Sequence, residues 1–166
     1  MNEKYLFNVT LRSDGSSLFG EGQKWGWFPA AQAAWRISDE QFMKDVRWLS
    51  NLKLRLSYGT AGNNRIPSGI LAVLYKMQGN TGTHAYFGEN ETPALETVNY
   101  IQNSNLKWET TVTRNIGIDY GFFRGRINGS LDLYWNTTKD LLMLARVQSN
   151  AGRTYQYQNF GQTSNK

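Results

Sequence analysis

Two neighbouring runs of the chain alternate apolar and polar side chains with a period of two. In residues 107–122 the apolar side chains occupy mostly even positions, whereas in residues 127–136 they occupy odd positions. A period of two is typical of a β-strand with one wet and one dry face. Because Gly125 suits the positive φ of a two-residue hairpin loop, the pattern predicts a hairpin whose turn is Arg124–Gly125. The dry face consists of Trp108, Val112, Ile116, Ile118, Tyr120 and Phe122 before the turn, and Ile127, Leu131, Leu133 and Trp135 after it.

Further alternating stretches predict four more strands. Residues 52–59 alternate most regularly, with leucines at even positions and Lys53 and Arg55 between them. Pro29 marks the start of a strand or an irregularity in it. The additional strands are expected at residues 4–12, 27–37, 52–59 and 154–162.

Two connecting segments differ from this pattern. Residues 38–51 predict a short helix, because Ser38 can cap it and acidic residues suit its first turn. Residues 60–105 are rich in Gly, Asn and Thr, and so long an insertion between strands is usually functional or disordered.

Strand length favours a membrane protein. Ordinary strands average roughly 5 to 6 residues, whereas a tilted strand that crosses a bilayer needs roughly 9 to 11. The aromatic residues at the ends of the dry face resemble the two girdles of a barrel wall: Trp108, Tyr120, Phe122 and Trp135. We therefore expect an all-β fold, an antiparallel transmembrane β-barrel segment of about six long strands that form an incomplete barrel, with long extracellular loops and one short helix. The alternative is a long β-sandwich with a half-buried sheet.

A barrel wall fixes the direction in which side chains point. Leu54 and Leu56 should face lipid, and Lys53 and Arg55 the lumen. If Phe123 pairs with Arg126, the one charge on the dry face of the hairpin, Arg114, lies opposite Trp135. Eight residues at ~3.4 Å with a tilt of ~45° put Arg114 about 19 Å above Phe122 in an apolar band of ~25 Å, close to the outer headgroups.

Barrel topology also predicts the two ends of the strands. Bacterial barrels have short periplasmic turns and long extracellular loops, so we expect the Arg124–Gly125 turn to be periplasmic. The connector at residues 38–51 then lies on the same side, although it is long for a periplasmic turn. The expected extracellular loops are residues 13–24, 62–105 and 141–154.

Composition and charge exclude several classes of function. The chain is 40% hydrophobic and 14% aromatic with 16 glycines, which favours β structure. Its net charge of +5 comes from basic residues that do not cluster, so no nucleic-acid partner is expected. The absence of cysteine excludes a disulfide scaffold and a thiolate metal site.

Catalytic chemistry is not expected either. The single histidine, His84, would have to serve any Ser-His-Asp triad, and no G-x-S-x-G elbow is near it. Glu89 and Glu91 could pair for glycoside hydrolysis, but a solvated loop edge explains them. The glycines at 20, 22 and 26 do not follow a strand and open a helix, so they are not a dinucleotide site. We expect no enzyme activity, no cofactor and no metal.

Six segments follow one another in a specific order: "DGSSLFG", "WGWFPAAQAAWRISDEQFM", "WLSNLKLRLSYGTAGN", "NLKWETTVTRNIGIDYGFF", "RINGSLDLYWNTTKDLLM" and "NFGQTSNK". This order resembles the C-terminal barrel of the SusC/RagA-type TonB-linked outer-membrane transporters, the TonB-dependent receptors. The resemblance covers nearly the whole chain except about residues 65–100.

The resemblance implies a large transporter in the cell outer membrane. Its family has a many-stranded barrel, a plug in the lumen, energy from the TonB complex, and a SusD-like surface lipoprotein that acts as a lid over a glycan or peptide ligand. Residues 1–166 are expected to be part of the TonB-dependent receptor β-barrel domain, an internal fragment with no plug domain or signal peptide of its own. Transport is therefore expected of the parent protein.

Aromatic residues near the loops are the candidate ligand contacts. Sugars stack on aromatic rings, and ligand sites pair such rings with a few polar groups. The candidates are Trp25, Trp27, Tyr86 and Phe87. Alternatively, the two tryptophans form an interfacial girdle, and the other pair holds the loop together. The alternative function for the whole chain is a soluble β domain that binds carbohydrate on an aromatic face.

Overall fold

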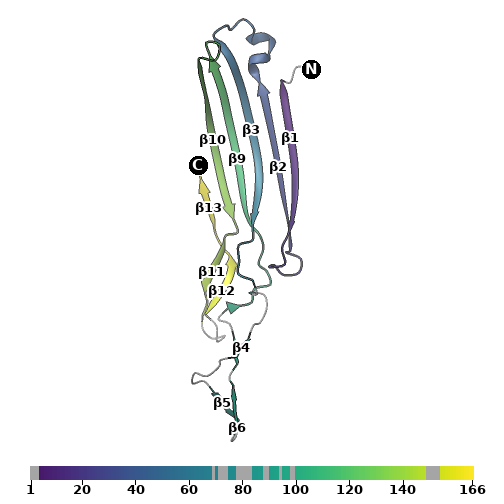
Figure 1. The fold of residues 1–166 in the computed structure, drawn as a ribbon, viewed down its shortest axis with the longest axis vertical. Coiled ribbons are helices and arrows are strands. Elements are labelled where there is room, and N and C mark those ends of the chain that lie inside the picture. The colour runs from purple at the N-terminus through teal and green to yellow at the C-terminus, as the bar shows by residue number, and fades with distance from the viewer. Residues whose placement is uncertain are drawn as a thin grey trace.

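Six strands form one antiparallel sheet whose neighbours are in the order β1-β2-β3-β9-β10-β13. The computed structural model describes residues 4–68, 70, 100–148 and 154–166, and the backbone of residues 75–77, 84–87, 90–93 and 95–97. Figure 1 shows the long strands side by side, curving together along the long axis of the molecule. The strands are β1 (Tyr5–Gly15), β2 (Trp25–Arg36), β3 (Leu49–Asn63), β9 (Glu109–Phe122), β10 (Ile127–Lys139) and β13 (Gln162–Asn165).

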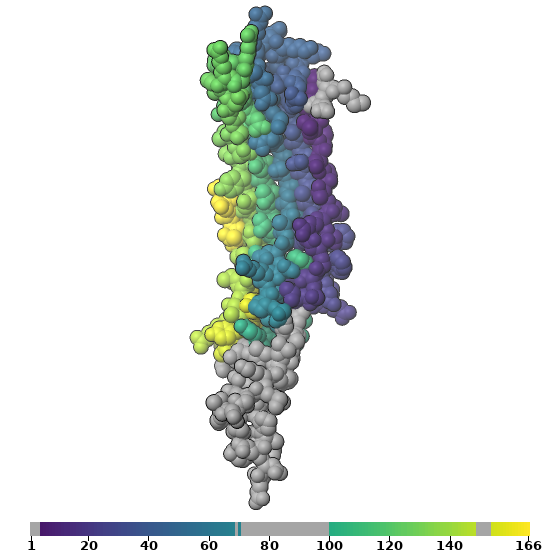
Figure 2. All heavy atoms as spheres, viewed as in Figure 1, coloured from purple at the N-terminus to yellow at the C-terminus, as the bar shows by residue number. Residues whose placement is uncertain are grey.

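The five long strands confirm the length argument. They contain 11, 12, 15, 14 and 13 residues in chain order, which exceeds a typical strand and suffices to cross a bilayer. Their side chains form one continuous slab (Figure 2). The sheet is open, with β1 and β13 at its edges. The expected incomplete barrel of six strands is thus confirmed, although β13 is short.

The β9–β10 hairpin has the predicted register. Phe122 pairs with Ile127, and Arg114 with Trp135. The turn is centred on Arg124 and Gly125, which have φ of 56° and 81°, and the Arg126 N–H donates to the Phe123 carbonyl at 3.4 Å. Both central residues at positive φ are typical of a type I′ turn.

Phe123 differs from the expectation. It also has a positive φ, 53°, and its N–H donates to the Trp48 carbonyl at 2.8 Å. The paired ladder therefore ends at Phe122 and Ile127, and Phe123 and Arg126 close the turn instead of extending the strands.

Pro29 lies inside β2, where pairing with β3 ends. The last β2–β3 pair at this end is Ala30 with Gly59, whereas β1 pairs with β2 along its whole length. Beyond that pair, the Thr60 hydroxyl donates to the Pro29 carbonyl at 3.0 Å. Proline lacks a backbone donor, and its predicted role as an irregularity is confirmed.

The helix predicted for residues 38–51 is wrong. Two single-turn 3-10 helices occur instead, η1 (Ile37–Asp39) and η2 (Gln41–Met43), and Ser38 does not cap either. Glu40 separates them in an extended conformation, because its carboxylate accepts hydrogen bonds from Lys4 and Tyr5 next to it. Tertiary contacts thus override the local propensity. No helix in the described part of the chain is long and apolar enough to span a membrane.

The predicted strand at residues 154–162 is split. β12 (Tyr155–Asn159) pairs with β11 (Leu142–Arg146) and with β8 (Tyr100–Ile101) in a separate sheet, and only β13 joins the large one. β11 lies where we expected a loop. The two ladders nevertheless share one register, since Lys139 pairs with Gln162 and Leu142 with Asn159. Asp140 and Gly161 fall opposite each other between them, both at positive φ, and bend one long hairpin.

The insertion at residues 60–105 also contains short strands. Besides β8, these are β4 (Tyr75–Met77) paired with β7 (Leu95–Thr97), and β5 (His84–Phe87) paired with β6 (Asn90–Pro93). β3 itself continues to Asn63, into the segment expected to be a loop.

A small core lies at the loop end of the large sheet. Trp108 packs on it, with ring centroids 5.3 Å from Phe19 and 5.5 Å from Phe28, and its indole N–H donates to the Lys24 carbonyl. Its expected place on the dry face is therefore wrong, because β9 begins at Glu109 and the alternation does not extend to Trp108. The buried members of the core are Phe19, Ile66, Ile70 and Leu106.

Candidate functional site

One face of the large sheet is apolar and exposed. The exposed fractions of Phe7 and Val9 are 77% and 80%. A β-sandwich would cover such side chains with a second sheet, whereas lipid can cover them in a barrel wall. Cross-strand pairing places these residues on one face: Tyr5, Phe7, Val9, Leu11, Trp25, Trp27, Leu54, Leu56, Tyr58, Ile116, Ile118, Leu131 and Leu133.

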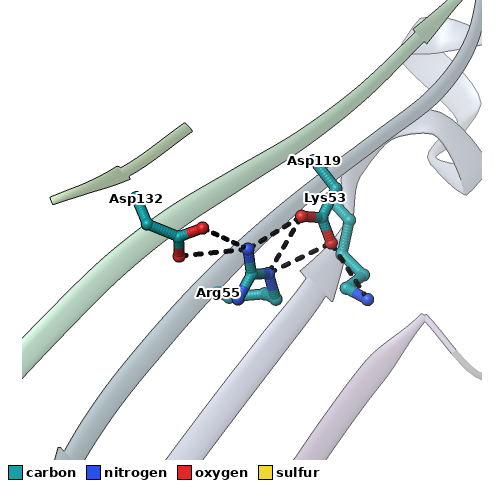
Figure 3. Close-up of polar contacts among 4 residues, drawn as sticks. All are labelled: Lys53, Arg55, Asp119 and Asp132. Atoms are coloured by element: carbon teal, nitrogen blue, oxygen red, sulfur yellow. Dashed lines mark hydrogen bonds and ion pairs between the residues drawn. The ribbon is translucent and has the colours of Figure 1, made fainter. Parts of the chain in front are cut away.

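The opposite face carries a network of four charged side chains. The Arg55 guanidinium lies 2.8 Å from a carboxylate oxygen of Asp119 and 3.1 Å from one of Asp132, and the Lys53 ammonium lies 3.2 Å from Asp119. Figure 3 shows Arg55 between the two carboxylates. Lys53 and Arg55 thus lie on the face opposite Leu54 and Leu56, as predicted.

Gly117 makes this network possible. In the sheet, Gly117 pairs with Arg55 on one side and with Asp132 on the other. A Cβ atom at Gly117 would lie 2.5 Å from an Asp132 oxygen and 2.8 Å from the Arg55 guanidinium carbon. The guanidinium therefore crosses β9 above a residue without a side chain. Two cations and two carboxylates balance across three strands.

The next row of the polar face is neutral. It consists of Asn8, Gln32, Ser57, Asn115 and Tyr134, one from each long strand. A depression of about 430 Å³ lies over the first four, next to Lys53 and Arg55. The Asn115 Oδ1 atom is buried and has no hydrogen-bond partner among the described residues. This row can donate hydrogen bonds to a polar partner and accept them from it.

Aromatic side chains mark the turn end of the apolar face. Tyr5 stacks beside Trp35 with centroids 6.3 Å apart, and Phe122 contacts both Tyr120 and Trp48 at 5.4 and 5.6 Å. Aromatic rings with a polar edge suit the boundary between lipid and water.

Glu40 anchors this aromatic end. Its carboxylate accepts hydrogen bonds from the Tyr5 hydroxyl at 2.7 Å, the Lys4 ammonium at 3.0 Å and the Trp35 indole at 3.2 Å. These hydrogen bonds lower the pKa of Glu40 from 4.5 to about 2, and the one from Tyr5 has the largest effect. The connector is thereby joined to the first residues of β1 and the last of β2.

Trp25 and Trp27 lie at the other end of the same face. Both are exposed and pair across the sheet with Gly15 and Ser13. Ten residues of β2 separate Trp25 from Trp35, which at ~3.4 Å per residue and a tilt of ~45° is about 24 Å, close to the ~25 Å of an apolar band. This position favours the interfacial-girdle interpretation of the two tryptophans.

The other predicted site residues lie in β5. Tyr86 pairs with Glu91 of β6, and Phe87 with Asn90, while their side chains lie outside the described part of the structure. His84 also lies in β5, and Glu89 lies outside the described residues. In the described part of the chain, no group of three His, Cys, Asp or Glu side chains is arranged to hold a metal ion.

Sequence reasoning missed the ionic network. Lys53 and Arg55 were expected on the polar face, and Asp119 occupies an odd position of residues 107–122, which also belongs to the polar face; the structure pairs it with Ser130. The missing information was the pairing of β3 with β9 across an insertion. A search for acidic residues on the polar faces of the other predicted strands would have suggested Asp119 as a partner of the two cations.

The sequence matches known proteins along its whole length. Residues 1–166 match the family described as TonB dependent receptor-like, beta-barrel. The chain is 40% identical over 144 residues to the TonB-dependent receptor SusC of Bacteroides thetaiotaomicron, covering 87% of this chain and 14% of SusC. It is 40% identical over 163 residues to the TonB-dependent receptor P39 of Formosa agariphila, covering 98% of this chain and 15% of P39.

A solved structure has the same fold. The RagAB peptide importer in its open-open state superposes with a TM-score of 0.80 at 28% sequence identity, covering 98% of this chain and 17% of that one. The chain therefore spans about a sixth or less of the length of the relatives that it matches.

Proposed function

Because the chain belongs to the TonB-dependent receptor β-barrel family, we propose that it is part of the wall of an outer-membrane transporter that imports oligosaccharides or peptides. The observation that carries the proposal is the two-faced sheet. One face exposes large apolar side chains over about the thickness of an outer-membrane apolar band, and the other neutralises its charges with Arg55, Asp119 and Asp132. Relatives of this family are transporters and not enzymes.

In this proposal, the full-length protein provides the other strands and domains of the transporter. A barrel edge that stays unpaired is costly in lipid, so β1 and β13 each pair with a further strand of the full-length chain. Residues 1–166 then act as one partial barrel domain, and other parts of the parent provide the plug and the contact with the TonB complex. A SusD-like surface lipoprotein is the proposed partner on the extracellular side. The name of the RagAB importer, which combines two letters, supports such a two-protein assembly.

The ligand class follows from two sources. RagAB is a peptide importer, which supports a peptide, while the resemblance to SusC-type transporters supports an oligosaccharide. The neutral row that includes Gln32, Ser57 and Asn115 suits either, since both ligands present hydroxyl or amide groups to hydrogen-bond. Among the aromatic candidates, we assign Trp25 and Trp27 to the lipid boundary, and keep Tyr86 and Phe87 as ligand contacts.

Uptake by cells tests the proposal. A host that carries the full-length protein and its neighbouring lipoprotein should accumulate a labelled oligosaccharide or peptide, and a protonophore that collapses the inner-membrane gradient should abolish uptake. The protein should sediment with the outer membrane and require detergent for extraction. Recovery as a soluble monomer that binds a glycan in buffer would instead support the carbohydrate-binding alternative.

A matched pair of variants tests the loop aromatics. The double substitution Tyr86→Ala and Phe87→Ala should reduce uptake without changing the amount of folded barrel. Trp25→Ala with Trp27→Ala should reduce the folded amount and leave uptake per folded protein unchanged. The reverse pattern would exchange the two assignments.

A further inference from the structure

The described strand residues of the apolar face include two charged side chains, Arg114 and Lys139. Arg114 pairs across the sheet with Tyr58 on one side and with Trp135 on the other, and Lys139 pairs with Thr110. Both cations are exposed. Neither forms an ion pair or a side-chain hydrogen bond with any described residue. Their charges are thus available to a partner outside the sheet.

The other cations in the described strands of the large sheet are neutralised within the chain. Arg12 pairs with Asp14, and Lys53 and Arg55 share Asp119. These pairs lie on the polar face, which has water and protein around it. The face that must contact lipid therefore carries the uncompensated charges, which is unfavourable unless an anion meets them.

Height along the strand places both charges near one lipid–water boundary. Arg114 lies about 19 Å above Phe122, and Lys139 lies about 29 Å above Ile127, when ~3.4 Å per residue and a tilt of ~45° are used. The apolar band is ~25 Å thick. Arg114 is thus just inside the boundary, where its long side chain can reach outward, and Lys139 is just outside it. Trp25 and Trp27 end the same face at this end of the sheet.

The side chains between the two cations are suited to an oxyanion. Four residues of β10 separate Trp135, beside Arg114, from Lys139, a distance of about 14 Å. Thr137 lies between them on the same face, and Thr110 lies beside Lys139. A guanidinium, an ammonium and two hydroxyls form a donor set that recognises phosphate.

We propose that Arg114 and Lys139 bind the phosphate groups of a lipid headgroup in the outer leaflet, with Trp135 and Tyr58 in contact with its sugar and acyl portion. The proposal rests on the proposed function, because it requires the loop end of the sheet to lie at the outer surface of the membrane. The ligand is a phosphorylated glycolipid of that leaflet.

Lipid binding to the full-length protein tests the inference. The detergent-purified protein is titrated with lipid A and with enzymatically dephosphorylated lipid A, and bound lipid is counted by native mass spectrometry. The wild type should bind the phosphorylated form preferentially. Arg114→Gln combined with Lys139→Gln should weaken that binding about a hundredfold, because each of the two lost charge-assisted contacts is worth about tenfold. Inorganic phosphate at the same concentration should not compete, because the acyl chains contribute.

Arg126→Gln is the matched control. Arg126 is an exposed arginine without a described side-chain partner, but it lies in the turn at the opposite end of the sheet. This variant should bind lipid A like the wild type. Equal binding of both lipids by the wild type, or equal loss in the control, would overturn the inference.

Folding is measured in the same samples by heat-modifiable migration on gels. If the wild type forms a barrel but binds phosphorylated and dephosphorylated lipid A equally, the headgroup site is wrong and the transporter proposal stands. If no barrel forms from the full-length protein, both are wrong. Should Arg114→Gln fail to fold, Lys139→Gln alone must weaken phosphate-dependent binding and Arg114→Lys must retain it. Normal binding by Lys139→Gln would then overturn the site.

Discussion

Arg55 of β3 and Asp132 of β10 meet across the intervening strand β9, with a nitrogen–oxygen distance of 3.1 Å. The contact passes directly over Gly117, which pairs with both residues. Asp119 holds the same guanidinium from the side at 2.8 Å. One arginine therefore joins three strands on the polar face, and a glycine provides the space.

Replacing this glycine should weaken the wall. In Gly117→Ala, the new methyl group would lie 2.5 Å from an Asp132 oxygen, so the Arg55–Asp132 contact must break or the two side chains must turn aside. About a third of each side chain is exposed, so the lost ion pair is worth roughly 1 kcal/mol or less. Because the crowded atoms are the ends of side chains that can turn aside, the expected total cost is about 1 kcal/mol. Urea unfolding of the full-length barrel measures it.

Gly59→Ala is the control for that prediction. Gly59 also lies on the polar face, but a methyl group there would meet only the Ala30 Cβ atom at 3.6 Å, an ordinary contact. Its stability should stay within about 0.5 kcal/mol of the wild type. If both alanine variants lose the same stability, Gly117 has no special role in the network.

The assigned faces of β3 predict losses of different size for substitutions at two neighbouring residues. Leu54→Arg puts a charge on the lipid side, which costs about 2 to 4 kcal/mol near the membrane centre. Arg55→Leu removes a charge from the polar side, where Lys53 still pairs with Asp119. The first variant should therefore assemble far less folded barrel than the second, measured by heat-modifiable migration. Similar losses in both would contradict the assigned faces.

Acid should abolish the contribution of the Glu40 carboxylate to the stability of the fold. Its pKa falls from 4.5 to about 2 on folding, because Tyr5, Lys4 and Trp35 donate hydrogen bonds to the ionised form. A lowered pKa stabilises the fold above the unfolded value, and this stabilisation is lost as pH falls from about 4.5 to about 2. Glu40→Gln should thus be less stable than the wild type at pH 7, and the difference should shrink over that interval.

Asp45→Asn provides the comparison for Glu40. Asp45 is an exposed carboxylate in the same connector, without a described side-chain contact. Its substitution should leave the stability at pH 7 within about 0.5 kcal/mol of the wild type. A difference for Glu40→Gln that stays constant down to pH 2 would show that the carboxylate charge is not what matters.

The alternation of side chains predicted most of the large sheet. Wherever one face of a strand is apolar, a slip by one residue would expose the wrong side chains, so the pattern specifies the register. This is why the pairing of Arg114 with Trp135 was predictable. The bend at Asp140 and Gly161 was not, because its positive φ angles leave the alternation on either side unchanged. The helix predicted for the connector was wrong for another reason: Glu40 accepts a hydrogen bond from Lys4, which is far away in sequence.

The polar face was only partly predictable. Parity assigned Lys53, Arg55 and Asp119 to one face, but parity does not identify which strands are neighbours. The network depends on β3 lying beside β9, two strands that an insertion separates in sequence. The role of Gly117 was also hidden, because a glycine in a strand signals close approach without naming what approaches.

Orientation in the membrane can be tested with protease. The turn at Arg124–Gly125 and the connector lie together at one end of the sheet, joined by the Phe123–Trp48 backbone hydrogen bond. The β1–β2 loop and the described residues that directly follow β3 lie at the other end (Figure 1). The grouping is thus as predicted, and the extracellular side remains a prediction. Protease added to intact cells should cut within residues 79–90, whereas cutting only after the outer membrane is opened would reverse the orientation.

The central claim is that alternate residues of β10 face lipid and lumen. The segment contains no cysteine, so single cysteines at residues 130, 131, 133 and 134 of an otherwise cysteine-free full-length protein can carry a spin label. In reconstituted membranes, labels at Leu131 and Leu133 should collide with oxygen, which dissolves in lipid. Labels at Ser130 and Tyr134 should collide instead with a water-soluble nickel chelate. Uniform accessibility along β10, or an alternation of opposite phase, would contradict the assignment of this sheet to a barrel wall.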